Sequence, residues 1–166
     1  MARKKGNIFS QYWVAVIVGV VLLAFLAWRQ VGSSETIPTS NSSIKTFRSN
    51  QVMDFAIEVP SVFEITEKSS RVSFSGSKGA IYIDQVFTEL NDLDTYILNS
   101  KNNLETRLED REEVSINNLE AVSGFIGDRK EYLIYANGRV YFIFTDSPDL
   151  YNDLDQMARS FRYTPN

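Results

Sequence analysis

The sequence predicts an antiparallel α+β domain that follows a single membrane-spanning helix. Two observations concern the domain. From residue 44 onward, short runs alternate apolar and polar residues as half-buried strands do, and two later segments repeat apolar residues at helical spacing. The third observation is an apolar run from Tyr12 to Trp28 that contains no charged residue. Runs of this kind are typical of transmembrane helices.

The apolar run of 17 residues would span about 25 Å as a helix, the short end of what a bilayer core requires. Aromatic rings stand at both ends, where amphipathic side chains prefer the headgroup boundary. Arg3, Lys4 and Lys5 precede the run and only Arg29 follows it closely, so the positive-inside rule places the N-terminus in the cytoplasm. We therefore expect a basic cytoplasmic N-terminus at residues 1–11, a transmembrane signal anchor at 12–29, a flexible Ser/Thr-rich linker at 30–43 and an extracytoplasmic domain at 44–166.

A cleaved signal peptide is the alternative interpretation of the same run. Val31-Gly32-Ser33 would supply the small residues of a cleavage site. However, the apolar run is longer than the ~7–15 residues usual for a signal core, and Arg29 separates it from that site. These features favour a retained anchor, which makes the cell membrane the first expected partner and the protein a single-pass one.

The composition excludes several classes of chemistry. The chain has no cysteine and no histidine, so it cannot build a disulfide, a lipid-anchor cysteine, a Ser-His-Asp triad or a histidine zinc site by itself. From residue 44 onward, 13 Lys and Arg stand against 20 Asp and Glu, a net charge of −7. Because an acidic domain without a basic stripe repels phosphate backbones, we expect no nucleic-acid partner.

The domain begins with short strands joined by turns. In the segment 54–60, Phe55, Ile57 and Val59 alternate onto one face, and the run stops at Pro60. Further strands are expected at 44–48, 63–66, 71–75, 80–87, 114–116 and 119–126, with turns at 76–79, 117–118 and 127–128.

The segment YLIYANGRVYFIFT, residues 132–145, predicts a hairpin around Asn137-Gly138, one of the strongest short turn signals. A two-residue loop pairs Ala136 with Arg139 and assigns the other residues to two faces. One face carries Leu133, Tyr135, Val140, Phe142 and Phe144, and the other carries Tyr132, Ile134, Tyr141 and Ile143. Because both faces are apolar, the strands are expected to be central and covered on both sides, with the rings as core rather than as an exposed binding platform.

Two helices complete the expected domain, either on one face of the sheet or divided between two. The first is expected to start at Asn91 as the cap, with apolar and small residues at helical spacing as far as Leu104. The second starts at Ser147-Pro148-Asp149, where Ser is the cap and Pro the first helical residue. Its apolar stripe is Leu150, Leu154, Met157, Ala158 and Phe161, and a short edge strand is expected after it.

The order of these elements resembles the PsbP-like family, whose superfamily also includes a Ran-binding nuclear transport factor. Four segments carry the resemblance: FAIEVPSVFE, NDLDTYILNSKNNL, LIYANGRVYFIFT and DQMARSFRY. They are similar to the family's opening strand, its Asp-Leu-x-x-Tyr helix, its central hairpin, and its closing helix and strand. The resemblance implies an α/β/α sandwich with an antiparallel central sheet. Family members include extrinsic subunits that help photosystem II retain calcium and chloride; only the fold is carried over here.

Acidic residues are the plentiful groups for acid–base or calcium chemistry. One set is Glu105, Glu109, Asp110, Glu112 and Glu113, interleaved with Arg107 and Arg111, and a second is Asp146, Asp149, Asp153 and Asp155. The first set is typical of a solvated helix end followed by an edge strand. The second is typical of acids that stabilise the start of a helix or lie on its polar face. Gly76-x-x-Gly79 lacks the ending of a phosphate loop, and Ser73, Ser75 and Ser123 have no histidine to activate them. We therefore assign no catalytic, cofactor-binding or metal residue, expect no cofactor, and leave the binding residues undefined.

Two functions of different classes remain open. The first is a non-catalytic binding or accessory module, held outside the membrane and docking onto a protein or another envelope component. The second is a hydrolase that uses only Asp and Glu, with a metal ion. A deep pocket lined by converging carboxylates would favour the enzyme, whereas a shallow surface with acids pointing outward would favour the module.

Overall fold

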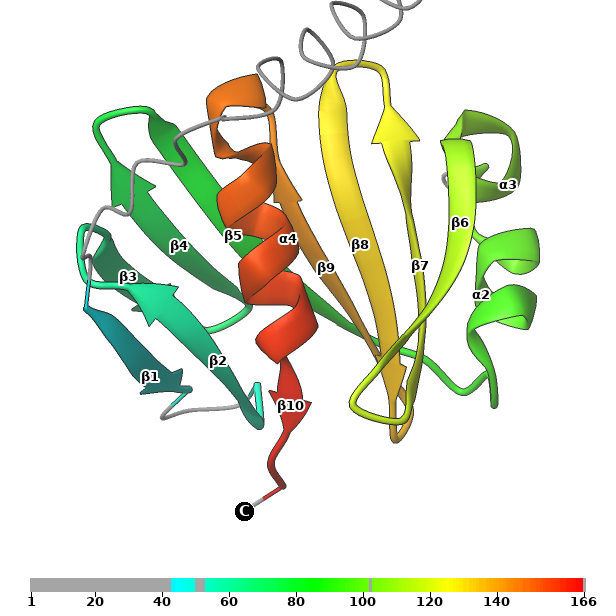
Figure 1. The fold of residues 1–166 in the computed structure, drawn as a ribbon. Coiled ribbons are helices and arrows are strands. Elements are labelled where there is room, and N and C mark those ends of the chain that lie inside the picture. The colour runs from blue at the N-terminus through cyan, green and yellow to red at the C-terminus, as the bar shows by residue number, and fades with distance from the viewer. Residues whose placement is uncertain (1–42, 50–52, 102, 166) are drawn as a thin grey trace, which may run out of the picture. The chain divides into compact units, whose positions relative to one another are not determined.

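The computed structural model describes residues 43–49, 53–101 and 103–165, which form a mixed fold dominated by antiparallel strands with a few helices (Figure 1). This confirms the antiparallel α+β class. The strands are β1 (Ile44–Arg48), β2 (Phe55–Pro60), β3 (Glu64–Lys68), β4 (Arg71–Gly76), β5 (Gly79–Phe87), β6 (Glu109–Ile116), β7 (Leu119–Ile126), β8 (Arg129–Ala136), β9 (Arg139–Thr145) and β10 (Arg162–Tyr163). The helices are α2 (Leu93–Asn99), α3 (Leu104–Arg107), the 3-10 turn η1 (Pro148–Leu150) and α4 (Tyr151–Ser160).

No helix in these described ranges is long and apolar enough to cross a membrane. The expected cytoplasmic segment 1–11 and anchor 12–29 lie outside the described residues. So does the expected linker at 30–43, apart from its last residue. These three assignments therefore stay predictions.

The strands form two antiparallel sheets. The large sheet has seven strands in the order β3-β4-β5-β9-β8-β7-β6, and the small one has three in the order β1-β2-β10. β10 forms an edge of the small sheet, as expected for the last strand of the domain.

The Asn137-Gly138 hairpin adopts the predicted register. Ala136 pairs with Arg139, and both loop residues have positive φ, 49° at Asn137 and 73° at Gly138, as a type I′ turn requires. β8 and β9 lie inside the large sheet, with β5 and β7 as their outer neighbours. The prediction that these are central strands is therefore confirmed.

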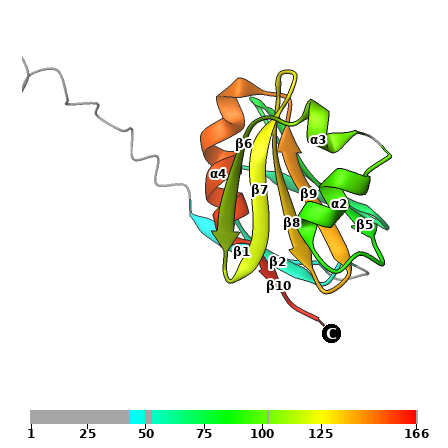
Figure 2. The same ribbon diagram turned by 90° about the vertical axis from the view of Figure 1, so that its right-hand side faces the viewer.

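Helices lie on both faces of the large sheet. Figure 2 shows α4 on one side of the sheet, and α2 and α3 on the other. The side chains divide accordingly into two buried clusters: Tyr132, Ile134, Tyr141 and Ile143 pack with α4 and β2, whereas Leu133 and Val140 pack with α2 and α3. The apolar stripe predicted for α4 is buried as expected, from Leu150 to Phe161.

The tyrosines of the hairpin are core residues. Tyr141 is 0% exposed, and its hydroxyl donates to the Met53 carbonyl oxygen at 2.6 Å. Tyr132 is 6% exposed and donates to Asp155 Oδ1 at 2.8 Å. Because each buried hydroxyl has an acceptor, the rings are packed and not presented as a platform, which confirms the prediction for these two residues.

The first helix differs from its prediction in both its cap and its length. Asp92, not Asn91, is the cap, because its carboxylate accepts from the Thr95 backbone nitrogen at 2.7 Å and from the Thr95 hydroxyl at 2.9 Å. The expected helix reaching Leu104 is divided into α2 and the short α3. The left-handed φ of 52° at Asn103, which precedes α3, is incompatible with a continuous helix.

Strand β6 starts five residues earlier than the predicted 114–116. It begins at Glu109 and contains a bulge between Glu109 and Glu112, where Asp110 has a φ of 49°. The strand can be highly charged because it is an edge of the sheet, and most of its side chains are exposed. Charge and bulge together discourage another strand from pairing with this edge.

Candidate functional site

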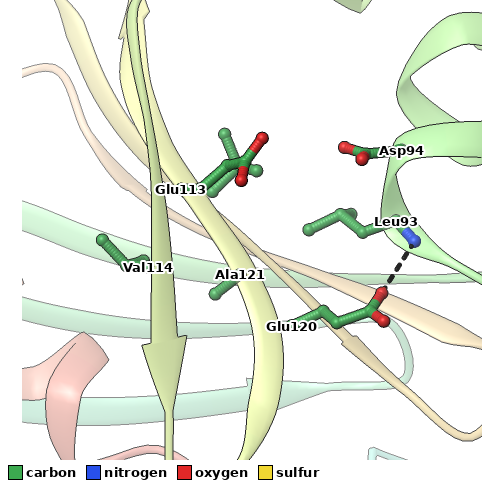
Figure 3. Close-up of a pocket in the computed structure, with 7 residues that line it drawn as sticks. Leu93, Asp94, Glu113, Val114, Glu120 and Ala121 are labelled. Atoms are coloured by element: carbon green, nitrogen blue, oxygen red, sulfur yellow. Dashed lines mark hydrogen bonds between the residues drawn. The ribbon is translucent and has the colours of Figure 1, made fainter.

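A hollow of about 250 Å³ lies between the start of α2 and strands β6 and β7 (Figure 3). Three of its lining residues are acids, Asp94, Glu113 and Glu120. Figure 3 shows Asp94 on the helix side and Glu113 on the strand side of the hollow, with Glu120 bonded to the start of the helix. The remaining lining residues are Leu93, Val114, Ala121 and Val122.

The three carboxylates of this hollow already have partners within the domain. Arg111 forms an ion pair with Asp94, and its guanidinium lies 3.8 Å from Glu113 Oε1. Glu120 Oε2 accepts from the Leu93 backbone nitrogen at 3.3 Å. A cation of the protein itself therefore lies between two of the acids. In the described ranges, no group of three or more acidic side chains is arranged to hold a metal ion.

A second region lies on the large sheet beyond the cover of α2 and α3. We call it the open face: the side of β3, β4 and β5 that is turned away from α4. Alternate residues of these strands point there, and they are half-buried or exposed. In the described part of the chain, no helix packs on the open face. The buried cluster beneath α2 and α3 contains strand residues from β7, β8 and β9 and none from β3, β4 or β5. Its central residues are Thr66, Arg71, Ser73, Ser75, Tyr82 and Asp84.

An aromatic pair stands at the border between the open face and the helical cover. The rings of Tyr82 and Phe144 lie across neighbouring strands with centroids 5.4 Å apart. The guanidinium of Arg71 lies 5.4 Å from the Tyr82 ring, and that of Arg129 lies 4.4 Å from the Phe144 ring. Both distances are within the range of cation–π attraction. We call these four residues the arginine–ring cluster.

Each arginine of the cluster is also tied to an aspartate. Arg71 donates two hydrogen bonds to Asp84, both of 2.6 Å, and these hydrogen bonds, together with the charge of Asp84, raise the pKa of Arg71. Arg129 donates through Nε to Asp146 Oδ1 at 3.0 Å. The cluster therefore combines two rings and two cations with two anions, and its charges balance locally.

A hollow of about 360 Å³ adjoins the cluster at the start of β5. Tyr82 and Asp146 contribute to its lining, together with the turn that leads into η1. That turn is fixed because Ser147 Oγ donates to the Lys78 carbonyl oxygen at 2.8 Å and Thr145 Oγ1 donates to the Ala80 carbonyl oxygen at 2.8 Å. The other lining residues are Gly79, Ala80, Ser147 and Pro148.

Glu131 is a buried acid next to the arginine–ring cluster. It lies directly across from Phe144 on β9, is 3% exposed, and its Oε2 has no hydrogen-bond partner in the structure. Burial raises the pKa of Glu131 to about 7; Asp84 and Asp146 add to the rise, and Arg129 and Arg107 oppose it. Burial also raises the pKa of Tyr96 on α2, with a contribution from the charge of Glu131.

No known family model and no curated protein matches this chain. The resemblance to the PsbP-like family therefore stays a prediction.

The acids singled out from the sequence lie mostly where they were expected. Glu105 and the acids of β6 are exposed on α3 and the edge strand. Asp155 is an exception: it was assigned to the polar helix face, but it is half-buried and accepts hydrogen bonds from Tyr132 and from Lys130, the latter at 2.8 Å. It therefore connects α4 to β8. Gly76 and Gly79 pair across the β4–β5 turn, as expected of a hairpin.

Glu131 and the arginine–ring cluster were not predicted from the sequence. The residues come from four different strands, and only strand pairing brings them together. One signal was available: Glu131 interrupts the apolar side of β8 that continues with Leu133 and Tyr135. A charged residue in a strand with two covered faces indicates a special environment.

Proposed function

We propose that residues 44–166 form a non-catalytic binding module of PsbP-like type, an α/β/α sandwich that docks onto a protein partner through the open face. The observation that carries the proposal is the arginine–ring cluster. The tilted rings of Tyr82 and Phe144 lie beside the guanidinium groups of Arg71 and Arg129, at the border of a sheet surface without helical cover. Aromatic residues and arginine are the residue types that contribute most to protein–protein binding energy.

Charge favours the open face as the docking surface of this acidic domain. The domain carries 13 Lys and Arg against 20 Asp and Glu, whereas on the cluster two arginines balance Asp84 and Asp146. A partner therefore meets less repulsion there than on the acidic edge strand β6. The matching chemistry is a protein segment with an aromatic or aliphatic side chain that packs on the rings, next to a carboxylate that receives hydrogen bonds from the Arg71 guanidinium.

The location of the module is part of the same proposal. The apolar run at 12–28 and the basic residues before it support a retained anchor, with the N-terminus in the cytoplasm and the domain outside the cell membrane. The full chain should then fractionate with membranes and resist extraction with carbonate. Recovery of a soluble form that begins near Ser34 would instead support a cleaved signal peptide.

A carboxylate-based, metal-dependent hydrolase is the alternative, and the acid-lined hollow of Figure 3 is the observation that favours it. Arg111 argues against it, because the arginine would have to leave Asp94 before a metal ion could bind there. A ligand that binds only the native state raises its melting temperature. Calcium or manganese should therefore raise the melting temperature if the hydrolase proposal holds, and Asp94→Asn should remove the effect.

Site-specific photo-crosslinking tests the docking proposal. A benzoylphenylalanine at position 82 of the membrane-anchored full chain should give one adduct of constant mass after irradiation of intact membranes. The matched control carries the same group at Asn152, an exposed position on α4, on the opposite side of the sheet. An adduct at position 82 that is lost on Arg71→Ala would support docking through the open face. No adduct at 82, or the same adduct at both positions, would contradict it.

A further inference from the structure

Glu131 is buried beside apolar residues of the sheet, and its Oε2 lacks a hydrogen bond that would stabilise a negative charge. Its cross-strand neighbours on the same face of the sheet are Phe144 on β9 and Gly124 on β7. Leu108 packs so closely over Gly124 that an added Cβ would lie 2.8 Å from Leu108 Cγ. Because Oε2 has no hydrogen-bond partner in the structure, the ionised form needs a cation to move toward it.

Arg129 is the cation best placed to make that movement. It precedes Glu131 by two residues on the same strand, so both side chains point to the same face about 6.6 Å apart along the strand. In the structure its guanidinium covers the Phe144 ring and pairs with Asp146. The side chains of Arg129 and Asp146 are 40% and 63% exposed, and exposed ion pairs of this kind contribute little. Little is therefore lost when Arg129 leaves Asp146.

We propose that Arg129 is a proton-controlled cover of Phe144: when Glu131 ionises, Arg129 turns from the ring to the buried carboxylate and uncovers the ring at the border of the open face. This inference rests on the proposed function, because it regulates the same docking surface. With Glu131 protonated, Arg129 stays on the ring and the surface is covered. With Glu131 ionised, the ring becomes available to the partner.

The charged groups around Glu131 are consistent with this direction of movement. Besides Arg129, the groups that act on it are Asp84 on β5, Asp146 after β9 and Arg107 on α3. Tyr96 on α2 faces it as a neutral ring that responds to its charge. The two aspartates repel a carboxylate at position 131, and each has an arginine of the cluster as its partner. Burial raises the pKa of Glu131 to about 7 while Arg129 lies on the ring, and pairing with Arg129 would favour the ionised form, so the change should occur at or slightly below neutral pH.

The exposure of Phe144 can be measured without any partner. We would incorporate 4-fluorophenylalanine at position 144 of the full chain in detergent micelles. The difference in ¹⁹F shift between H₂O and D₂O then reports the solvent exposure of this ring from pH 5.5 to 8.5. Exposure should rise with a midpoint at or slightly below pH 7. Glu131→Gln should keep the ring covered throughout, and Arg129→Gln should leave it exposed throughout.

Arg107→Gln is the matched control, because Arg107 also acts on Glu131 but does not cover the ring. It should move the midpoint to higher pH and keep the full change in exposure. A change that persists in Glu131→Gln, or no change in the unmodified chain, would overturn the proposal. If the change in exposure is lost in Arg107→Gln but kept in Arg129→Gln, Arg107 and not Arg129 covers the ring, and the proposal is overturned as well. The amide signals of each variant at pH 5.5 check that it is folded.

Crosslinking at position 82 across the same pH range separates this inference from the proposed function. An adduct whose yield rises several-fold between pH 6 and pH 8 supports both. An adduct of constant yield supports docking and overturns regulation by Glu131. If the ring becomes exposed with pH but no adduct forms at any pH, the cover exists and the proposed docking function is wrong.

Discussion

Replacing Glu131 by glutamine should make the domain more stable at alkaline pH and leave it unchanged at acid pH. Burial raises the pKa of Glu131 from its ordinary value of 4.5 to about 7, so the folded state holds this proton more tightly than the unfolded chain. The stability that comes from the protonated acid is therefore complete below pH 4.5 and is lost as the pH rises through 7. One pKa unit corresponds to about 1.4 kcal/mol, so the loss amounts to as much as about 3 kcal/mol.

The measurement is urea unfolding of the full chain in a non-ionic detergent, followed by the near-ultraviolet circular dichroism of its tyrosines. Glu131→Gln and the unmodified chain should have the same unfolding free energy at pH 4, and they should differ by about 2–3 kcal/mol at pH 8.5 in favour of the variant. Glu105→Gln, which removes the same charge from an exposed site, is the control and should show no such difference. Equal stability of Glu131→Gln and the unmodified chain at pH 8.5 would refute the argument that burial controls this acid.

Two further substitutions test the packing that surrounds the site. Tyr141→Phe leaves the buried Met53 carbonyl oxygen without its donor and should lower the unfolding free energy by about 1–3 kcal/mol in the same urea assay. Tyr151→Phe is the control, because the Tyr151 hydroxyl makes an exposed hydrogen bond, and it should lower the unfolding free energy by less than about 1 kcal/mol. Equal losses in the two variants would contradict the argument from burial. Gly124→Ala places a Cβ 2.8 Å from Leu108 Cγ and should lower the unfolding free energy by about 1–3 kcal/mol in the same assay. An unchanged unfolding free energy would show that this contact relaxes without cost.

The central hairpin could be predicted from the sequence because its signals are local and agree with one another. Asn137-Gly138 determines the turn type, the turn type determines the register, and the register assigns each apolar side chain to a face. Both faces proved to be covered at Leu133 and Ile134, as the lack of polar alternation indicated. The stripe of α4 was equally predictable, since Ser147-Pro148 marks where helical structure begins.

The first helix was harder to predict because its competing signals are a few residues apart. Asn91 and Asp92 are both good caps, and only the hydrogen bonds to Thr95 decide between them. Its end depends on the left-handed backbone at Asn103, which the apolar spacing of the segment does not reveal. Helix propensity and the spacing of apolar residues are properties of a whole segment, so they do not determine at which residue a helix ends.

The site itself depends on how far the helices extend over the sheet. α2 and α3 cover β7, β8 and β9, so Leu133 is enclosed there, but the next pair along these strands, Glu131 and Phe144, lies where that cover ends. An acid at such a border is shielded enough to hold its proton near neutral pH, and it is still close enough to the surface for Arg129 to reach it. Deeper in the core the charge would have no cation to meet, and farther out on the open face water would stabilise it. The proposed proton-dependent change at the proposed docking surface therefore requires this border position and would fail at either neighbouring one.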